Sequence, residues 1–99
     1  MNMQQMLMQA QKMQRELQKA QNELKAKEFT VSKGGAVTVV VKGDNTVKSI
    51  NIDEDAFDKD NKEMVEEMVA MAINEAIAQI EKESAEINER ITGRAGGMF

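Results

Sequence analysis

Apolar side chains recur at alternating steps of three and four residues at the start of this chain. They stand at Met3, Met6, Ala10, Met13, Leu17, Ala20 and Leu24. This is a heptad repeat, and its 3.5-residue period places a narrow apolar seam along one side of a helix. Such a seam packs along another helix rather than into a broad core. The sequence therefore predicts a helix over residues 3–27 that is suited to pairing with another helix.

A short sheet is predicted after this helix. Residues 29–33, 36–42 and 47–52 are rich in β-branched side chains and alternate in polarity, which is typical of strands. A glycine pair at 34–35 and a Gly-Asp-Asn-Thr run at 43–46 separate them with turn-forming residues. Because connections this short join antiparallel neighbours, we expect a three-stranded antiparallel meander.

A second helix is predicted from about Asn61 to Ile91. Asp60 is suited to cap its first turn, and Phe57, in the acidic connector that precedes it, is expected to point inward. The first half of this helix has a broad apolar face, and the second half narrows to a seam like that of the first helix. The expected order is α-β-β-β-α, an α+β fold.

The same pattern gives a simple domain organisation. We expect one domain over residues 1–91, followed by a flexible glycine-rich tail over residues 92–99.

The lengths of the elements predict that both helices project beyond the sheet that they must cover. The first helix spans about 37 Å and a six-residue strand about 20 Å. Two arrangements remain open: a homodimer with projecting helical arms, and a monomer whose helices pair antiparallel beyond the sheet. We favour the homodimer, because a three-stranded sheet buries little surface and has two open edges. The predicted seam of the dimer and its arms consists of Met6, Met13, Leu17, Ile80, Ile87 and Ile91.

Composition argues against catalysis. The 99 residues include no His and no Cys, so they supply no imidazole base, no thiolate nucleophile and no thiolate metal ligand. The acidic connector over residues 53–60 does not have the ligand spacing of a calcium loop, and the glycines form no phosphate-binding motif. We expect no enzyme activity, no cofactor, no metal and no small-molecule substrate.

The expected location is the cytoplasm. The sequence has no cysteine, which is typical of a reducing compartment, and its first residues lack the features of a signal peptide. No segment approaches the roughly 20 apolar residues that cross a bilayer, so no membrane partner is expected.

Charge is unevenly distributed along the chain. Residues 1–52 carry eight Lys or Arg and four Asp or Glu, whereas residues 53–99 carry five and thirteen. With a formal net charge of −4, the chain would need a segregated basic surface to bind nucleic acid. The candidate surface is the side of the first helix opposite its seam. Lys12, Arg15 and Lys19 form a stripe there, and Lys25 lies beside its end.

This stripe has two possible interpretations. It can contact DNA phosphates, with neighbouring Gln and Asn side chains at base edges, and a dimer would double the number of phosphate contacts. Alternatively it is a solvated helix face, with intrahelical Glu16–Lys19 and Glu23–Lys27 pairs. Spacing alone favours the solvated face.

Longer stretches of the sequence resemble a known family. They are the runs QAQKMQ at 9–14 and AQNEL at 20–24, the glycines at 34–35, Val37-Thr38-Val39, Gly43, and VKSINID at 47–53. In these runs and in the order of its elements, the chain resembles the YbaB/EbfC family of bacterial nucleoid-associated proteins.

The resemblance implies a tweezer-like cytoplasmic homodimer that binds double-stranded DNA, associates with the nucleoid, and influences nucleoid organisation or gene expression. It carries over no catalytic residue. It implies a DNA-contacting role for basic positions on the arms, which here are Lys12, Arg15, Lys19, Lys25 and Arg94. The alternative function is a protein-interaction adaptor or chaperone-like dimer that uses its Met-rich helical arms.

Overall fold

The computed structural model describes residues 2–96, with side chains described over residues 2–93. Its elements are α1 (Met3–Ala26), β1 (Glu28–Lys33), β2 (Val37–Lys42), β3 (Val47–Ile52), the short 3-10 turns η1 (Glu54–Ala56) and η2 (Lys59–Asn61), and α2 (Lys62–Gly96). The strands form one antiparallel sheet in the order β1-β2-β3. The predicted order of elements and the predicted meander are confirmed.

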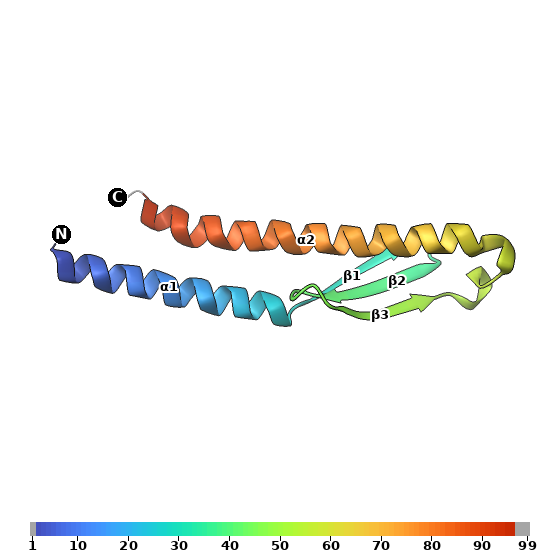
Figure 1. Ribbon diagram of the computed structural model, residues 1–99, viewed down its shortest axis with the longest axis horizontal. Coiled ribbons are helices and arrows are strands. Elements are labelled where there is room, and N and C mark those ends of the chain that lie inside the picture. The colour runs from blue at the N-terminus through green and yellow to red at the C-terminus, as the bar shows by residue number, and fades with distance from the viewer. Residues whose placement is uncertain (1, 97–99) are drawn as a thin grey trace.

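The molecule is a rod that measures 69 × 20 × 14 Å. Its Cα radius of gyration is 19.6 Å, whereas a compact domain of this length has about 13 Å. Figure 1 shows the reason: the sheet lies along the first half of α2, and α1 runs beside the second half. The expectation that both helices cover the sheet is wrong, because α2 alone covers it and α1 projects away from it.

The core of the sheet end forms between one face of the sheet and α2. Val37, Val39 and Val41 on β2 are at most 1% exposed. On α2, Ala72 and Ala76 are completely buried against them. Because alanine has so small a side chain, the helix can lie close to the β-branched surface of the strands.

The rest of α2 pairs with α1 in an antiparallel arm, defined here as α1 together with residues 80–96. Met13 and Leu17 of α1 pack against the cluster of buried residues that includes Ile80, Ile87 and Ile91. At the base of the arm, the Gln21 amide Nε2 donates to Asn88 Oδ1 at 3.1 Å. The two helices of one chain therefore cover most of the apolar seam that each presents.

The β2–β3 turn closes against the end of α1. The Gly43 N–H donates to the Lys27 carbonyl at 2.8 Å. A Cβ at Gly43 would lie 1.7 Å from the Leu24 carbonyl oxygen, so only glycine fits there. In the same turn the Thr46 hydroxyl donates to Asp44 and holds the pKa of that carboxyl below its usual range. This turn fixes the point from which the arm leaves the sheet.

The connector before α2 differs from the prediction in two respects. Phe57 is 78% exposed rather than turned inward, because the two 3-10 turns bury Ala56 instead. Asp60 does not cap α2: the carboxylate of Asp58 accepts the Asp60 N–H at 3.0 Å and caps the preceding turn, which leads directly into the helix at Lys62.

The end of α2 also differs from the prediction. The helix continues through Gly96 rather than ending at Ile91, and the Thr92 hydroxyl donates to the Asn88 carbonyl one turn earlier. A single glycine at position 93 does not stop a helix whose preceding turns are packed against α1. The flexible tail over residues 92–99 stays a prediction, and residues 97–99 lie outside the described part of the chain.

Candidate nucleic-acid interface

The basic stripe, defined as Lys12, Arg15 and Lys19, lies on the exposed side of α1. Because the heptad seam of α1 faces α2, the positions opposite that seam point to solvent. Lys25 is also exposed, in the last turn of the same helix. Arg94 belongs to α2, but its side chain falls outside the described part.

The stripe gathers on one helix face several cations that no carboxylate among the described residues holds. Several lysines elsewhere are held by carboxylates: Lys27 by Glu83, Lys33 by Glu75, Lys48 by Glu28, and Lys62 by Glu66. Within residues 2–93, by contrast, Lys12, Arg15, Lys19 and Lys25 hold no carboxylate and make no hydrogen bond. These four cations are therefore available to an external anion.

One of the two pairs expected for a solvated helix face is replaced by a tertiary contact. The Lys27 Nζ lies 2.8 Å from a carboxylate oxygen of Glu83 on α2, and 5.2 Å from the ring centroid of Phe29. Lys27 thus joins the sheet and α2 at the base of the arm instead of pairing with Glu23. This removes part of the argument for a merely solvated face.

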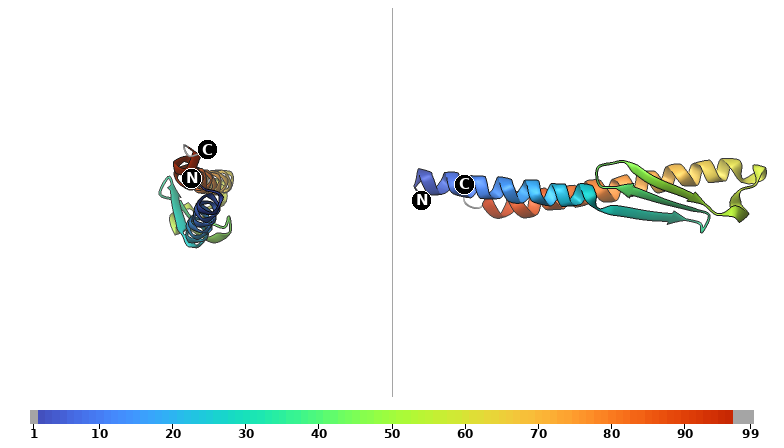
Figure 2. Two further views of the ribbon diagram at one scale, coloured as in Figure 1. Left: turned by 90° about the vertical axis from the view of Figure 1, so that its left-hand side faces the viewer. Right: turned by 90° about the horizontal axis from the view of Figure 1, so that it is seen from below.

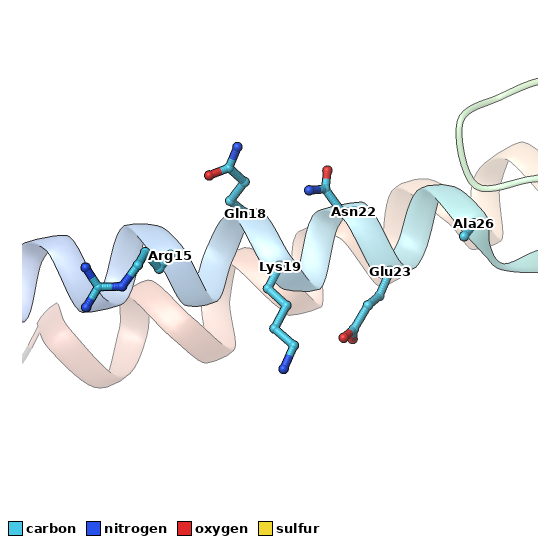
Figure 3. Close-up of a pocket in the computed structure, with 6 residues that line it drawn as sticks. All are labelled: Arg15, Gln18, Lys19, Asn22, Glu23 and Ala26. Atoms are coloured by element: carbon cyan, nitrogen blue, oxygen red, sulfur yellow. The ribbon is translucent and has the colours of Figure 1, made fainter.

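A shallow open groove lies beside Arg15 and Lys19 of the stripe (Figure 3). It is lined by Arg15, Gln18, Lys19, Asn22, Glu23 and Ala26. Figure 3 shows Gln18 and Asn22 pointing to one side of α1, and Lys19 and Glu23 to the other. The groove therefore offers two amides beside its cations, the side-chain type that reads base edges. The sequence analysis did not single out Gln18, although its four-residue spacing from Asn22 indicates a shared side of the helix.

The two helices of the arm carry opposite charge. α1 has four basic and two acidic side chains, whereas the sequence of α2 has four basic and eight acidic ones. In the arm, Glu81, Glu86 and Glu89 of α2 are exposed. A polyanion is therefore attracted to the α1 side and repelled from the α2 side.

The structure brings five of the six predicted seam residues into contact with one core cluster. Met13 and Leu17 meet the Ile80, Ile87 and Ile91 cluster within one chain. Met6 does not take part, and it is 44% exposed near the free end of α1.

Over residues 2–93, no three His, Cys, Asp or Glu side chains gather in a way that could hold a metal ion. Neither helix, as far as it is described, is long and apolar enough to cross a membrane.

The candidate surface is thus a charged helix face on a projecting arm, an arrangement typical of a class of proteins that bind a polyanion. Comparison with known proteins specifies the class further. The chain belongs to the YbaB/EbfC DNA-binding family, which matches residues 1–95. The family predicted from the sequence is confirmed.

Curated relatives agree with this assignment. A nucleoid-associated protein of Clostridium novyi (strain NT) is 42% identical over 102 residues, covering 100% of this chain and 90% of that protein. One from Clostridium botulinum (strain Eklund 17B / Type B) is 46% identical over 100 residues, covering 99% and 88%. One from Mycoplasmopsis pulmonis (strain UAB CTIP) is 40% identical over 91 residues, covering 92% and 90%.

Proposed function

We propose that this chain binds double-stranded DNA through the basic stripe and associates with the nucleoid in the cytoplasm, without catalysing a reaction. The observation that carries the proposal is the contrast in pairing. Four lysines near the sheet and at the start of α2 are held by carboxylates, while the three cations of the stripe share one exposed helix face, hold no carboxylate among the described residues, and are left for phosphates. The names of the curated relatives support the nucleoid as the site of action.

The proposed mechanism is phosphate contact by Lys12, Arg15 and Lys19, with Lys25 and Arg94 as additional cations on the arm. The exposed carboxylates of α2 orient the arm so that α1 faces the duplex. Gln18 and Asn22 line the same surface groove as Arg15 and Lys19, where their amides would face the base edges of a bound duplex. Phosphate contacts dominate, so we expect weak sequence preference.

A fluorescence-anisotropy titration with a labelled duplex tests DNA binding. Saturable binding that persists at about 150 mM salt supports the proposal, because several phosphate contacts are needed to withstand that ionic strength. Binding that disappears by then favours the alternative function, a protein-interaction adaptor or chaperone-like dimer. That alternative rests on the exposed methionines at the end of the arm: Met3, Met6 and Met8.

We further propose that the working form is a homodimer joined along the β3 side of the sheet. The β1 side of the sheet is covered by α2, because Phe29 and Val31 are buried in the core and Lys33 pairs with Glu75 of α2. On the β3 edge, by contrast, Val47 is 44% and Ile50 46% exposed. An open edge with apolar side chains is suited to a second copy. The dimer would carry two arms and two basic stripes.

Replacement of Ile50 by lysine tests this interface. Light scattering is expected to give twice the 11.1 kDa chain mass for the unmodified protein, and a mass near 11.1 kDa for Ile50→Lys. The side chain is nearly half exposed, so the fold should survive the change. Met71→Lys is the matched control, since Met71 is a similarly exposed apolar residue on α2, and it should remain dimeric. A monomeric unmodified protein would refute the homodimer.

A further inference from the structure

The free end of α1 carries an apolar surface that the described part of α2 does not cover. Met3 is 86% exposed, Met6 44% and Leu7 58%. Figures 1 and 2 both show α1 continuing past the described end of α2. The seam of α1 thus extends beyond the buried isoleucines of α2, the last of which is Ile91. We call the surface formed by Met3, Met6 and Leu7 the tip.

The tip is a formed helix rather than a loose terminus. The Asn2 side chain accepts the Gln5 N–H at 2.8 Å, and the Asn2 carbonyl accepts the Met6 N–H at 3.1 Å. The first bond satisfies a donor that a helix start otherwise leaves unpaired, and the second is the first backbone bond of the helix. Because the helix is formed from Met3 onward, its apolar seam also extends to Met3, where another helix can pack against it.

The absence of charged side chains at the tip indicates which kind of partner it binds. Residues 1–11 contain no Asp, Glu, Lys or Arg, and the first charged side chain is that of Lys12. An identical tip brings no charged side chain that would oppose the contact, whereas an acidic or basic partner finds no complementary side-chain charge. We propose that the tip packs against the tip of a second copy of this chain, seam to seam across a two-fold axis.

The size of the tip determines how the contact works. A few side chains per copy are far fewer than the roughly 20–30 residues a side of a stable interface. The contact is therefore weak between free molecules and becomes effective where copies are held close together. This part rests on the proposed DNA binding: neighbours on one duplex are close, so tip contacts make their binding cooperative.

Thiol cross-linking tests the contact without DNA, so that its outcome is independent of the proposed function. The chain has no cysteine, and Met6→Cys introduces a single thiol on the seam. Met8→Cys is the matched control, because Met8 is 63% exposed in the same region but on the opposite side of the helix. We expect a short bismaleimide to link Met6→Cys chains roughly tenfold faster than Met8→Cys chains, through a raised effective concentration. Equal rates would overturn the proposal.

Deletion of residues 97–99 tests the competing occupant, the C-terminal Gly-Met-Phe segment of the same chain. If a second copy occupies the tip, the deletion leaves the cross-linking rate of Met6→Cys unchanged. A severalfold increase after deletion would show that this segment covers the tip instead, and it would contradict the proposal.

Cooperative DNA binding is the second readout. The triple variant Met3→Gln/Met6→Gln/Leu7→Gln should bind a duplex that holds one dimer with unchanged affinity. On a duplex that holds many dimers, its Hill coefficient should fall to that of independent sites, whereas Met8→Gln should behave like the unmodified protein. Equal cooperativity in all three proteins would overturn the role on DNA. If no protein binds the short duplex, the proposed function fails, and the cross-linking result still decides the tip contact.

Discussion

Reversing the charge of the basic stripe is expected to abolish duplex binding while the protein stays folded. In Lys12→Glu/Arg15→Glu/Lys19→Glu, each phosphate contact becomes a repulsion, and a homodimer loses the contacts of both arms. We expect affinity in a fluorescence-anisotropy titration to fall by at least about 100-fold. The three side chains are exposed and hold no partner among the described residues, so circular dichroism should show an unchanged thermal midpoint.

A triple reversal elsewhere separates the stripe from net charge. Lys59→Glu/Lys62→Glu/Lys82→Glu changes the formal charge of the chain by the same amount at exposed positions outside the stripe. It should weaken binding only modestly, through the long-range field. Equal losses in the two variants would mean that overall charge, and not this helix face, determines the affinity. Retained affinity in the stripe variant would remove these residues from the interface.

Gly43→Ala is expected to have the largest effect on stability. The new Cβ would lie 1.7 Å from the Leu24 carbonyl oxygen and 3.2 Å from the Lys25 Cα, and both atoms belong to backbone. Neither can move away as the end of a flexible side chain could, so the β2–β3 turn must separate from the end of α1. We expect the free energy of unfolding, from urea denaturation, to fall by about 3 kcal/mol or more.

Gly35→Ala provides the comparison. Gly35 has a φ of +66°, and a Cβ there would meet no atom within 4 Å. Its replacement should cost only the backbone strain of a left-handed conformation, about 1 kcal/mol. If the two variants lose the same stability, the close approach of the turn to α1 is not what requires glycine at position 43.

The heptad spacing was sufficient to predict α1 and its partner seam, because the period of an apolar stripe determines which helix face is buried. Alternation and glycine turns likewise predicted the sheet. The same spacing could not show that α1 leaves the sheet uncovered. A seam specifies a helical partner but not where that partner lies, and the Gly43 turn, which sets the direction of α1, reads in sequence as an ordinary turn.

The candidate interface was only partly predictable. Heptad phase placed Lys12, Arg15 and Lys19 opposite the seam, which the exposed positions of the structure match. Which lysines are left unpaired depends on contacts between distant residues. The sequence predicted that Lys27, like Lys19, would pair with a glutamate of its own helix. In the structure Lys27 is held by Glu83 of α2, 56 residues further along the chain.

The salt dependence of duplex binding tests the central claim most directly. The stripe supplies three phosphate contacts on each arm of a homodimer, and Lys25 and Arg94 can add to them, so the logarithm of the binding constant should fall against the logarithm of salt concentration with a slope of about −5 or steeper. Lys19→Gln removes one contact from each arm and should make that slope shallower by about 2. A slope near zero, or a slope that Lys19→Gln leaves unchanged, would contradict the claim that this stripe binds the phosphates of DNA.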